Sequence, residues 1–289
     1  MDNRLKYSVL ISVYKGADPV AFKVSMHSIF GQSVAPNEIV LVEDGPVTPE
    51  LDKAIRDCMA ASPCAFNIVS YDTNHGLAYA LTEGIKHCTY PLVARMDADD
   101  ISARNRIELE LDAMENDPSL DMVGSQIVEF VSTPSNPISL TSLPLSDAEI
   151  KSFSKKRDPF RHPTMLMKKD SVIAAGSYRP DYLYFEDWDL FNRMLASGCK
   201  ARNLDVPLVA VRAGDDFYSR RGGIEYLKHA WRFKRDQYRN GYFSRIELLE
   251  SFVPQAVVCL IPNFLRSFIY STLLRSRPKD VCFEYHSER

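Results

Sequence analysis

The stretch that decides the expected fold is LVARMDADD, residues 92–100. It begins with an apolar run that ends at Met96, and it finishes in the carboxylates Asp97, Asp99 and Asp100. Such a run is typical of a strand buried on both faces, as in a parallel sheet covered by helices. Carboxylates packed this closely repel one another unless a cation or a cationic side chain joins them. The stretch therefore predicts a buried strand that carries an acidic site at its carboxyl end.

Strand and helix patterns alternate through the first third of the chain. Short apolar, β-branched runs predict strands over residues 7–13, 38–42, 65–71 and 92–96, and helical spacing predicts helices over 21–29, 51–59 and 77–88. Repeated units of this length indicate an α/β fold with a mainly parallel central sheet flanked by helices. Ligands bind such sheets outside the carboxyl ends of the strands. Polar residues stand at those ends here, namely Tyr14, Asp44, Asn74 and the Asp97–Asp100 cluster.

The pattern is less regular after residue 100. We expect helices over 104–116 and 187–197 and strands over 122–131 and 206–211, and the residues from Ser146 to Glu149 form a capping box that opens a short helix. Beyond Arg212 the sequence is helical, basic and aromatic. We therefore divide the chain into a catalytic domain, residues 1–212, and a C-terminal helical extension, residues 213–289.

The composition is that of an ordinary globular protein. The 289 residues carry a net charge of −3, and 45% of them are apolar. Acidic residues outnumber basic ones, 38 to 35, which argues against nucleic acid as a partner bound by bulk charge. The 6 cysteines form no C-x-x-C pair, which is typical of reduced thiols in a cytoplasmic protein. No apolar run reaches the ~18–20 residues of a membrane span, and no signal peptide is recognisable.

The triplet Asp97-Ala98-Asp99 is the central chemical feature. Its hard carboxylate oxygens suit Mg²⁺ or Mn²⁺, whose coordination is usually completed by phosphate oxygens and water. A bare D-x-D triplet arises readily by chance, and Asp187-Trp188-Asp189 is a second one, but only the first ends a buried strand. The alternative is an acidic turn that caps the following helix, a role that suits Asp100 better than metal binding does.

Five ordered motifs run through roughly residues 6–212. They are Ile11-Ser12-Val13-Tyr14, Val42-Glu43-Asp44-Gly45, Asn74-x-Gly76-Leu77-Ala78-x-Ala80-Leu81, Arg95-Met96-Asp97-Ala98-Asp99-Asp100 and Glu186-Asp187-Trp188. In this order and spacing, the sequence resembles the family 2 glycosyltransferases, which are inverting, metal-dependent enzymes of the GT-A fold. The stretches 216–223 and 262–266 are similar to bacterial members that build O-antigen, capsule or amylovoran-type exopolysaccharide.

The resemblance implies a donor site for a UDP-sugar of the galactose or glucose type. The residues that it assigns to this site are Ser12, Tyr14, Asp44, Asn74, Gly76, Arg95, Asp97, Ala98, Arg212 and Arg220. Tyr14 and Asp44 would border the base, since a carboxylate at a strand end can accept the N3–H of uracil. Asp97 would approach the ribose or the diphosphate, and Asp99 together with Asp97 would ligate Mn²⁺ or Mg²⁺.

Basic residues near these motifs have two possible roles. Arg95 and Arg106 pair either with the carboxylates and phosphates of the site or in structural ion pairs. Arg220 and Arg221 would close over the diphosphate, or else form a solvated basic patch. Many relatives have a histidine soon after the position of Arg212, and this sequence has none there, which leaves open what completes the phosphate site.

The acceptor side needs a base, because a sugar hydroxyl is a poor nucleophile at pH 7. The resemblance points to Asp187 as that base, at a helix start where the dipole favours an anion. Glu186 is the second choice, or a group that orients the acceptor. Trp188 would stack on a sugar ring or pack in the core. His162 falls where the family places pocket residues, although a single histidine is usually structural.

The C-terminal region combines basic and apolar-aromatic residues. The segment from Tyr226 to Arg245 is basic and aromatic, and apolar residues follow over 260–274. The pattern favours a helix on an anionic membrane surface, and the alternative is packing against the catalytic domain or a homodimer partner. The resemblance implies a lipid-linked (undecaprenyl-diphosphate) saccharide as acceptor, hence a cytoplasmic protein that is peripheral at the inner face of the cytoplasmic membrane.

Three other classes compete with this interpretation. A sugar-phosphate nucleotidyltransferase shares the layout, but the turn from Val13 to Ala17 has too few glycines to wrap a triphosphate. An inactive nucleotide-sugar-binding partner protein is disfavoured by the intact set of Asp97, Asp99 and Asp187. A dinucleotide oxidoreductase is disfavoured because no G-x-G-x-x-G follows the first strand.

Overall fold

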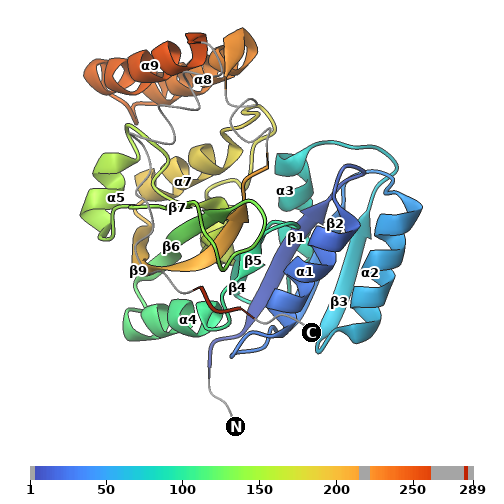
Figure 1. Cartoon of the computed structure of the whole chain (residues 1–289). Coiled ribbons are helices and arrows are strands. Elements are labelled where there is room, and N and C mark those ends of the chain that lie inside the picture. The colour runs from blue at the N-terminus through green and yellow to red at the C-terminus, as the bar shows by residue number, and fades with distance from the viewer. Residues whose placement is uncertain (1–3, 215–221, 262–282, 286–289) are drawn as a thin grey trace.

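The computed structural model describes residues 4–214, 222–261 and 283–285. Its strands form a mixed sheet in the order β3-β2-β1-β4-β8-β6-β9-β5, with β7 beside β6 (Figure 1). The strands are β1 (Tyr7–Val13), β2 (Glu38–Glu43), β3 (Ala65–Ser70), β4 (Leu92–Arg95), β5 (Ile101–Ser102), β6 (Leu120–Phe130), β7 (Ser139–Leu140), β8 (Leu166–Lys168) and β9 (Lys200–Arg212). The four predicted N-terminal strands are present within one residue of their expected bounds, and the predicted α/β class is confirmed.

Helices separate most of these strands. They are α1 (Pro19–Phe30), α2 (Pro49–Ala61), α3 (Leu77–His87), α4 (Arg106–Asn116), α5 (Asp147–Phe153), α6 (Lys169–Ala174), α7 (Glu186–Ala196), α8 (Gly223–Arg239) and α9 (Arg245–Leu260), with a 3-10 turn, η1, at His162–Thr164. Local signals explain where they begin. The Asp18 carboxylate accepts the amides of Val20 and Ala21 ahead of Pro19 at the first turn of α1. The capping box predicted at Ser146 opens α5.

Alternate residues of β1 supply two separate cores. Val9 and Ile11 pack with apolar residues of α1, α2 and α4 on one face of the sheet. Leu10 belongs to a second core on the other face, which also contains Leu81 of α3 and Leu190 of α7. Each such fully buried side chain contributes about 1.5–3 kcal/mol. The sheet is therefore held rigidly from both sides, which fixes the loops at its edge.

The carboxyl ends of four strands meet at one edge of the sheet. β1 is parallel to β2 and β4, and β2 is parallel to β3. The chain leaves β1 toward β2 and β3 and later returns to the opposite side of β1 as β4, so a topological switch point lies between β1 and β4. Open α/β sheets bind ligands in the crevice beyond such a point. Tyr14 follows β1 there, and Asp97 closely follows β4.

The sheet is less parallel than the sequence indicates. β8 is antiparallel to both β4 and β6, and β5 is antiparallel to β9. β5 and β8 are only two and three residues long, which is too short for a hydrophobic period to be recognised in the sequence. β9 begins at Lys200, earlier than expected, because polar residues interrupt the apolar pattern of its first half, which pairs with β6 through three register shifts.

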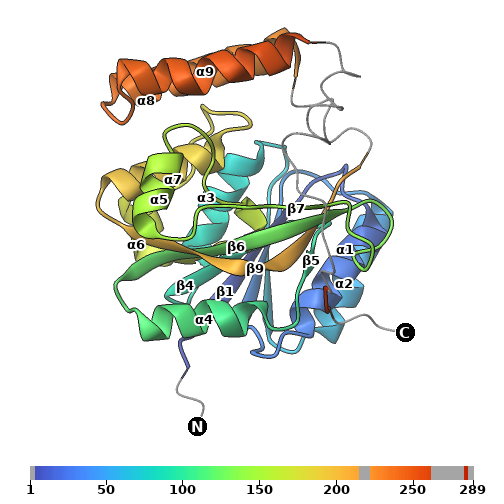
Figure 2. The ribbon, with the colours of Figure 1, turned by 60° about the vertical axis from the view of Figure 1, so that its left-hand side comes forward.

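Most of the described part of the C-terminal extension is a pair of helices, whereas Phe283 near the C-terminus packs in the core beside Ile101 and Val128. Figure 2 shows α8 and α9 as a layer beyond α5 and α7. An aromatic cluster joins this layer to α7, with Phe233 of α8 and Phe243 packed against Trp188 and Phe185. Among the described helices, none is long and apolar enough to cross a membrane. The five cysteines of the described residues are free thiols.

Candidate active site

The turn after β4 presents the Asp97–Asp100 carboxylates at the switch point. Asp97 has a side chain that is 39% exposed, and Asp99 is exposed. Asp100 is buried and accepts the backbone amide of Arg212 at 2.9 Å, so it ties the turn to β9. The Ser25 hydroxyl of α1 donates to the carbonyl of Asp97 at 3.0 Å. The turn is thus anchored on two sides and leaves Asp97 and Asp99 open to ligands.

The charges of this turn suit a cation. Burial and the neighbouring Asp97 and Asp99 raise the pKa of Asp100 well above its usual range. Desolvation by the surrounding protein atoms and the charge of Asp97 also raise the pKa of Asp99, although the residue as a whole remains exposed. Two carboxylates with open positions are what Mg²⁺ and Mn²⁺ use when phosphate oxygens complete their coordination. Within the described ranges no three ligand side chains converge, so Asp97 and Asp99 fit a metal only together with a phosphate ligand.

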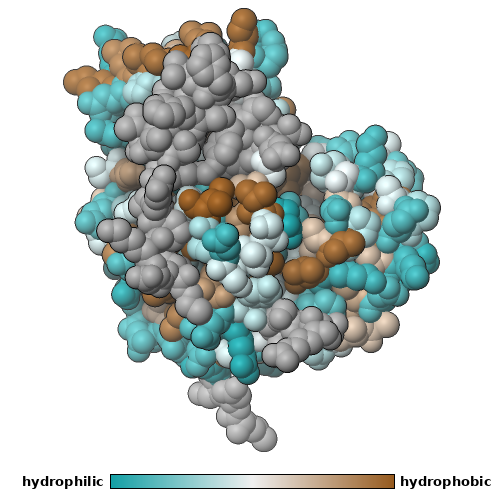
Figure 3. Space-filling model, viewed as in Figure 1, coloured by the Kyte–Doolittle hydropathy of each residue, from teal (hydrophilic) through white to brown (hydrophobic). Residues whose placement is uncertain are grey.

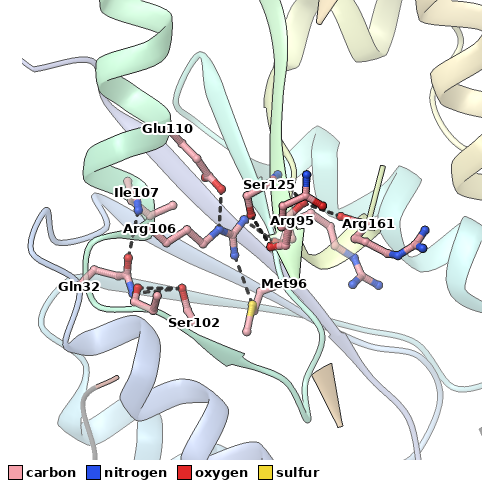
Figure 4. Close-up of polar contacts among 12 residues, drawn as sticks. Gln32, Arg95, Met96, Ser102, Arg106, Ile107, Glu110, Ser125 and Arg161 are labelled. Carbon is pink, nitrogen blue, oxygen red and sulfur yellow. Dashed lines mark hydrogen bonds and ion pairs between the residues drawn. The ribbon is translucent and has the colours of Figure 1, made fainter. Parts of the chain in front are cut away.

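Arg106 has the structural role that the sequence left open. It is buried, and its Nε pairs with Glu110 at 2.9 Å (Figure 4). Its Nη2 donates to the carbonyl of Arg95 at 3.0 Å, and its Nη1 lies 3.3 Å from the sulfur of Met96. Burial raises the pKa of Glu110 to about 7, although Arg106 opposes the shift. Arg106 therefore fixes the end of β4 rather than a phosphate.

Arg95 lies under the acidic turn. Its side chain is 2% exposed, and its Nη2 is 2.5 Å from Oδ1 of Asp97. The Arg95 amide donates to the carbonyl of Met165, the residue that follows the 3-10 turn η1. Nε and Nη1 of Arg95 are buried and have no hydrogen-bond partner in the described part of the chain. Arg95 is thus paired with a carboxylate, as expected, with donor capacity to spare.

The donor side differs from expectation at Asp44. Tyr14 is half exposed, at the carboxyl end of β1 next to Ser12, and its ring is free to border a base. Asp44 is 5% exposed, and its two oxygens accept the amides of His75 and Gly76 at 2.7 and 2.8 Å. Asp44 therefore stabilises the loop between β3 and α3, a structural role that its sequence motif did not indicate.

Backbone geometry fixes the same loop. Asn74 donates its side-chain amide to the carbonyl of Asp44 at 2.9 Å. Gly45 has a φ of +82°, and a Cβ on it would lie 2.7 Å from the Asn74 nitrogen. Gly76, with a φ of +89°, precedes the first residue of α3. Asn74 and Gly76 thus lie beside Asp44 and shape the loop through their backbone and amide groups, and their predicted part in donor binding stays a prediction.

Glu43 is a second carboxylate at the end of β2, and the sequence motif that contains it suggested no role for it. It pairs with Val13 in the sheet and is half-buried. Burial and the charge of Asp52 raise the pKa of Glu43, and Arg56 lowers it. The signal for it was its place as the last residue of a parallel strand beside the switch point. The Glu43 carboxylate is thus available to a ligand, whereas the Asp44 carboxylate is occupied by two backbone amides.

Glu186 and Asp187 are the first two residues of α7, and Glu186 lies within electrostatic reach of Arg95. Both are half-buried, and Asp187 accepts the Trp188 amide at 2.7 Å. Burial and the charge of Asp187 raise the pKa of Glu186 to about 7, and Arg95 lowers it. The preceding Tyr184 has a φ of +71°, an uncommon backbone for a non-glycine residue. The pair therefore combines a partly enclosed carboxylate with a shifted pKa, which is characteristic of functional acids and bases.

Trp188 and His162 are placed in the interior, away from the acceptor role. Trp188 is 5% exposed, stacks with the aromatic cluster and donates its indole N–H to the carbonyl of Ser154 at 2.8 Å. The expected contact of Trp188 with a sugar ring is therefore not what this structure supports. His162 is buried and its Nε2 is 2.8 Å from the hydroxyl of Tyr178. Burial and Arg95 lower the pKa of His162 well below its usual range, so the ring is neutral at pH 7.

The last predicted donor residues border the acidic turn. Arg212 packs its guanidinium 4.8 Å from the centroid of the Phe130 ring and lies 3.4 Å from the carbonyl of Asp99. Ala98 packs partly against the core under α1. Arg220 lies outside the described residues, as do the motif residues 262–266 and most of 216–223.

Comparisons with known proteins agree with this geometry. Residues 8–175 match the family model of Glycosyl transferase family 2. The chain is 33% identical over 276 residues to an Escherichia coli UDP-Gal:alpha-D-GlcNAc-diphosphoundecaprenol beta-1,3-galactosyltransferase, covering 95% of this chain and 98% of that one. It is 34% identical over 267 residues to the Erwinia amylovora amylovoran biosynthesis glycosyltransferase AmsE, covering 91% and 97%. The chain belongs to glycosyltransferase family 2 and is a transferase enzyme.

Solved structures support the fold. A Pyrobaculum calidifontis mannosyltransferase, in complex with GDP-Man and Mn²⁺, superposes with a TM-score of 0.64 at 16% identity over 92% of this chain and 72% of that chain. Residues 1–349 of Staphylococcus aureus TarS superpose with a TM-score of 0.59 at 14% identity over 94% and 76%. The GT-A fold expected from the sequence is confirmed, and the match to this family removes the case for a nucleotidyltransferase or an oxidoreductase.

Proposed function

We propose that this enzyme transfers a sugar, of the galactose or glucose type, from a UDP-sugar to a lipid-linked saccharide with inversion of configuration, in the synthesis of a bacterial surface polysaccharide. The observation that carries the proposal is the acidic turn at the switch point, where the buried Arg95 pairs with Asp97 and lies within electrostatic reach of Glu186. The end-to-end similarity to a UDP-galactose-dependent enzyme with a diphosphoundecaprenol acceptor supports this choice of donor and acceptor.

The donor would lie over the ends of β1 and β4. Tyr14 would border the base, and Asp97 and Asp99 would hold Mn²⁺ or Mg²⁺ together with the diphosphate. Bound there, the cation would neutralise the charge that develops on the leaving nucleoside diphosphate. Arg212 orders the turn on which these carboxylates stand, through its amide on Asp100.

The acceptor hydroxyl would approach from the side of α7. Asp187 would take its proton as the new glycosidic bond forms, and Glu186 would orient the acceptor. The N-terminus of α7 stabilises negative charge on both carboxylates. In an inverting transfer the acceptor hydroxyl would reach the anomeric carbon opposite the leaving group, and Asp187 would stand on that side.

A lipid-linked acceptor requires the enzyme to reach a membrane surface, and α9 offers a face for it. Five apolar residues of α9 are more than half exposed at helical spacing, namely Ile246, Leu249, Val253, Val257 and Leu260. Figure 3 shows apolar residues along the top of the molecule, where Figure 1 draws α9. Trp231 of α8 packs its ring 4.8 Å from Phe252 and is 42% exposed. An apolar stripe with a tryptophan beside basic residues is typical of a helix lying in a membrane interface.

Two measurements test the proposal. Calorimetric titration with UDP should show binding that needs Mn²⁺ and that EDTA reverses. Binding of GDP or dTDP in place of UDP would overturn the donor assignment. For the membrane face, the full chain should float with phosphatidylglycerol vesicles, and the double change Leu249→Glu with Val253→Glu should abolish flotation. Val20→Glu, at a 72% exposed residue of α1, is the matched control. Equal flotation of all three proteins would overturn the membrane contact.

A further inference from the structure

An exposed aromatic ring stands just before the carboxylate pair of α7, Glu186 and Asp187. Tyr184 is 47% exposed, although Tyr182 and Phe185 in the same loop are buried. Its backbone has a φ of +71°, a conformation that a bulky residue rarely adopts. Strained backbone of this kind persists where the surrounding structure enforces it, and it clusters at active sites and ligand clamps. The loop thus turns one large aromatic side chain outward at a cost in stability, which favours a role in binding over a role in packing.

The loop before α7, residues 181–185, packs on α8 of the C-terminal extension. At its start, Asp181 forms an ion pair with Arg232, with 3.0 Å between Oδ1 and Nη2. At its end, the buried ring of Phe185 stacks on that of Phe233, with 5.2 Å between the centroids and 10° between the planes. Both ends of the loop are therefore anchored to α8, which defines the position of the residues between them.

The same helix also supports the Tyr184 ring. The centroid of this ring lies 5.2 Å from that of Tyr226, with a tilt of 42°, and 5.8 Å from that of His229, edge to face. Phe233, one turn further along α8, is completely buried in the same interface. A tyrosine that only attached α8 to the catalytic domain would be covered in the same way. Tyr184 instead combines a fixed orientation with an open surface, and such preorganisation is what a contact with a ligand needs.

The ring is within reach of the proposed base. Tyr184 precedes Asp187 by three residues, so their Cα atoms are at most about 11 Å apart. Burial and the charge of Asp187 raise the pKa of Glu186, and a hydrogen bond from the backbone of Tyr184 is among the contacts that lower it. The strained residue therefore contacts the carboxylate that would orient the acceptor. An acceptor whose hydroxyl meets Asp187 would pass the Tyr184 ring.

We propose that Tyr184 is an acceptor-binding residue: its ring stacks on a sugar of the lipid-linked saccharide, and α8 holds the ring in place through Tyr226 and His229. The inference rests on the proposed function, in which α7 supplies the base. The C–H groups on one face of a pyranose pack against an aromatic ring, while the hydroxyl groups at its edge stay in water. Tyr184 thereby takes the role that the sequence suggested for Trp188, which is buried. The C-terminal extension then belongs to the acceptor subsite as well as to the proposed membrane face.

Steady-state kinetics of the full chain test the inference, with the better of UDP-galactose and UDP-glucose as donor, Mn²⁺, and GlcNAc-diphosphoundecaprenol as the varied acceptor. Y184A should raise the KM for this acceptor about tenfold, the loss expected for one stacked ring. Its kcat, and its affinity for UDP in the presence of Mn²⁺, should stay within about twofold of the wild type, because the ring contributes binding and no chemistry. Y184F, which keeps the ring, should restore the acceptor KM to within about twofold.

Two further variants separate stacking from damage to the loop. L183A truncates the neighbouring side chain, which is 51% exposed, and is the matched control, so its acceptor KM should stay within about twofold of the wild type. Y226A keeps Tyr184 and removes one of the rings that hold it, so it should raise the acceptor KM about threefold. If Y184A does not fold, Y184G takes its place, because glycine adopts a positive φ without strain.

An acceptor KM that stays unchanged in Y184A or Y184G would overturn the inference. An equal rise in Y184F would assign the effect to the hydroxyl group, and an equal rise in L183A would assign it to the loop, so either result would overturn it as well. An unchanged KM in Y226A would overturn the part assigned to α8. A wild type that binds no UDP with Mn²⁺ would instead contradict the proposed function. A wild type that binds UDP but transfers no sugar to this lipid would contradict the acceptor assignment, and the inference with it.

Discussion

The ammonium group of Lys234 lies 5.5 Å from the centroid of the Trp188 ring, in the contact between α8 and α7. Lys234 is 1% exposed and donates to the carbonyl of Ser251 in α9 at 2.5 Å. One buried cation thus joins both helices of the extension to the helix that begins with Glu186. Because burial lowers the pKa of Lys234 to about 7, the attachment of the extension depends on pH.

We expect the free energy of unfolding of the wild type to rise between pH 7 and pH 9.5 because of the lowered pKa of Lys234. The folded protein releases the proton near pH 7, while the unfolded chain keeps it up to about pH 10.4, so the unfolded state binds more protons in this range. The contribution should be roughly 2 kcal/mol. Lys234→Met should remove the rise, and urea denaturation at several pH values measures it. Parallel pH curves for the wild type and the variant would contradict the prediction.

We expect the two carboxylates at the end of β2, Glu43 and Asp44, to have different functions. Asp44→Asn weakens two hydrogen bonds to the His75 and Gly76 amides, so it should cost about 1–2 kcal/mol of stability. Glu43→Gln should leave stability within about 0.5 kcal/mol and weaken UDP binding about tenfold if the γ-carboxylate accepts the uracil N3–H. Calorimetry with UDP and with CDP measures both effects. A selective loss of UDP binding in Asp44→Asn would restore Asp44 as the base reader.

The parallel strands β1, β2 and β4 could be predicted because most of their residues have one role, which is to fill the core. β1, β2 and β4 are apolar on both faces, and the turn after β4 carries its carboxylates in sequence order. The roles of Asp44 and Trp188 could not be predicted, because they depend on neighbours distant in sequence: the amides of a loop 31 and 32 residues later, and aromatic rings on α8. Tyr178 carries no motif at all and becomes relevant only through its bond to His162.

The interior ion pair beside the site should be costly to break. Arg106→Met leaves Glu110 buried without its partner and frees the carbonyl of Arg95, so a loss of about 3–5 kcal/mol is expected. The double change Arg106→Met with Glu110→Leu should recover at least half of that loss, since no unpaired charge remains. Urea denaturation of the wild type, Arg106→Met and the double variant measures the loss of stability and its recovery. Additive losses would show that the two side chains act independently.

The acid limb of the pH–rate profile should report the ionisation of the carboxylate pair Glu186 and Asp187 on α7. Burial and the neighbouring Asp187 hold the pKa of Glu186 at about 7, and the proposed mechanism needs both carboxylates ionised, one to take the proton and one to orient the acceptor. The value of kcat/KM should therefore rise with pH up to about 7 and level off above it, because this ratio reports the free enzyme. Since the two groups interact, the apparent pKa belongs to the pair.

Variants of the pair give this prediction its controls. Glu186→Gln should remove the limb near pH 7, because the carboxyl group whose pKa burial and Asp187 raise to about 7 is then absent. Asp187→Asn should lower kcat by about 10²–10⁴-fold, while UDP binding in the presence of Mn²⁺ stays nearly intact. A limb that stays at pH 7 in Glu186→Gln would assign it to another group. Full turnover in Asp187→Asn would remove Asp187 as the base and leave Glu186, whose pKa already lies near the working pH, to take the proton.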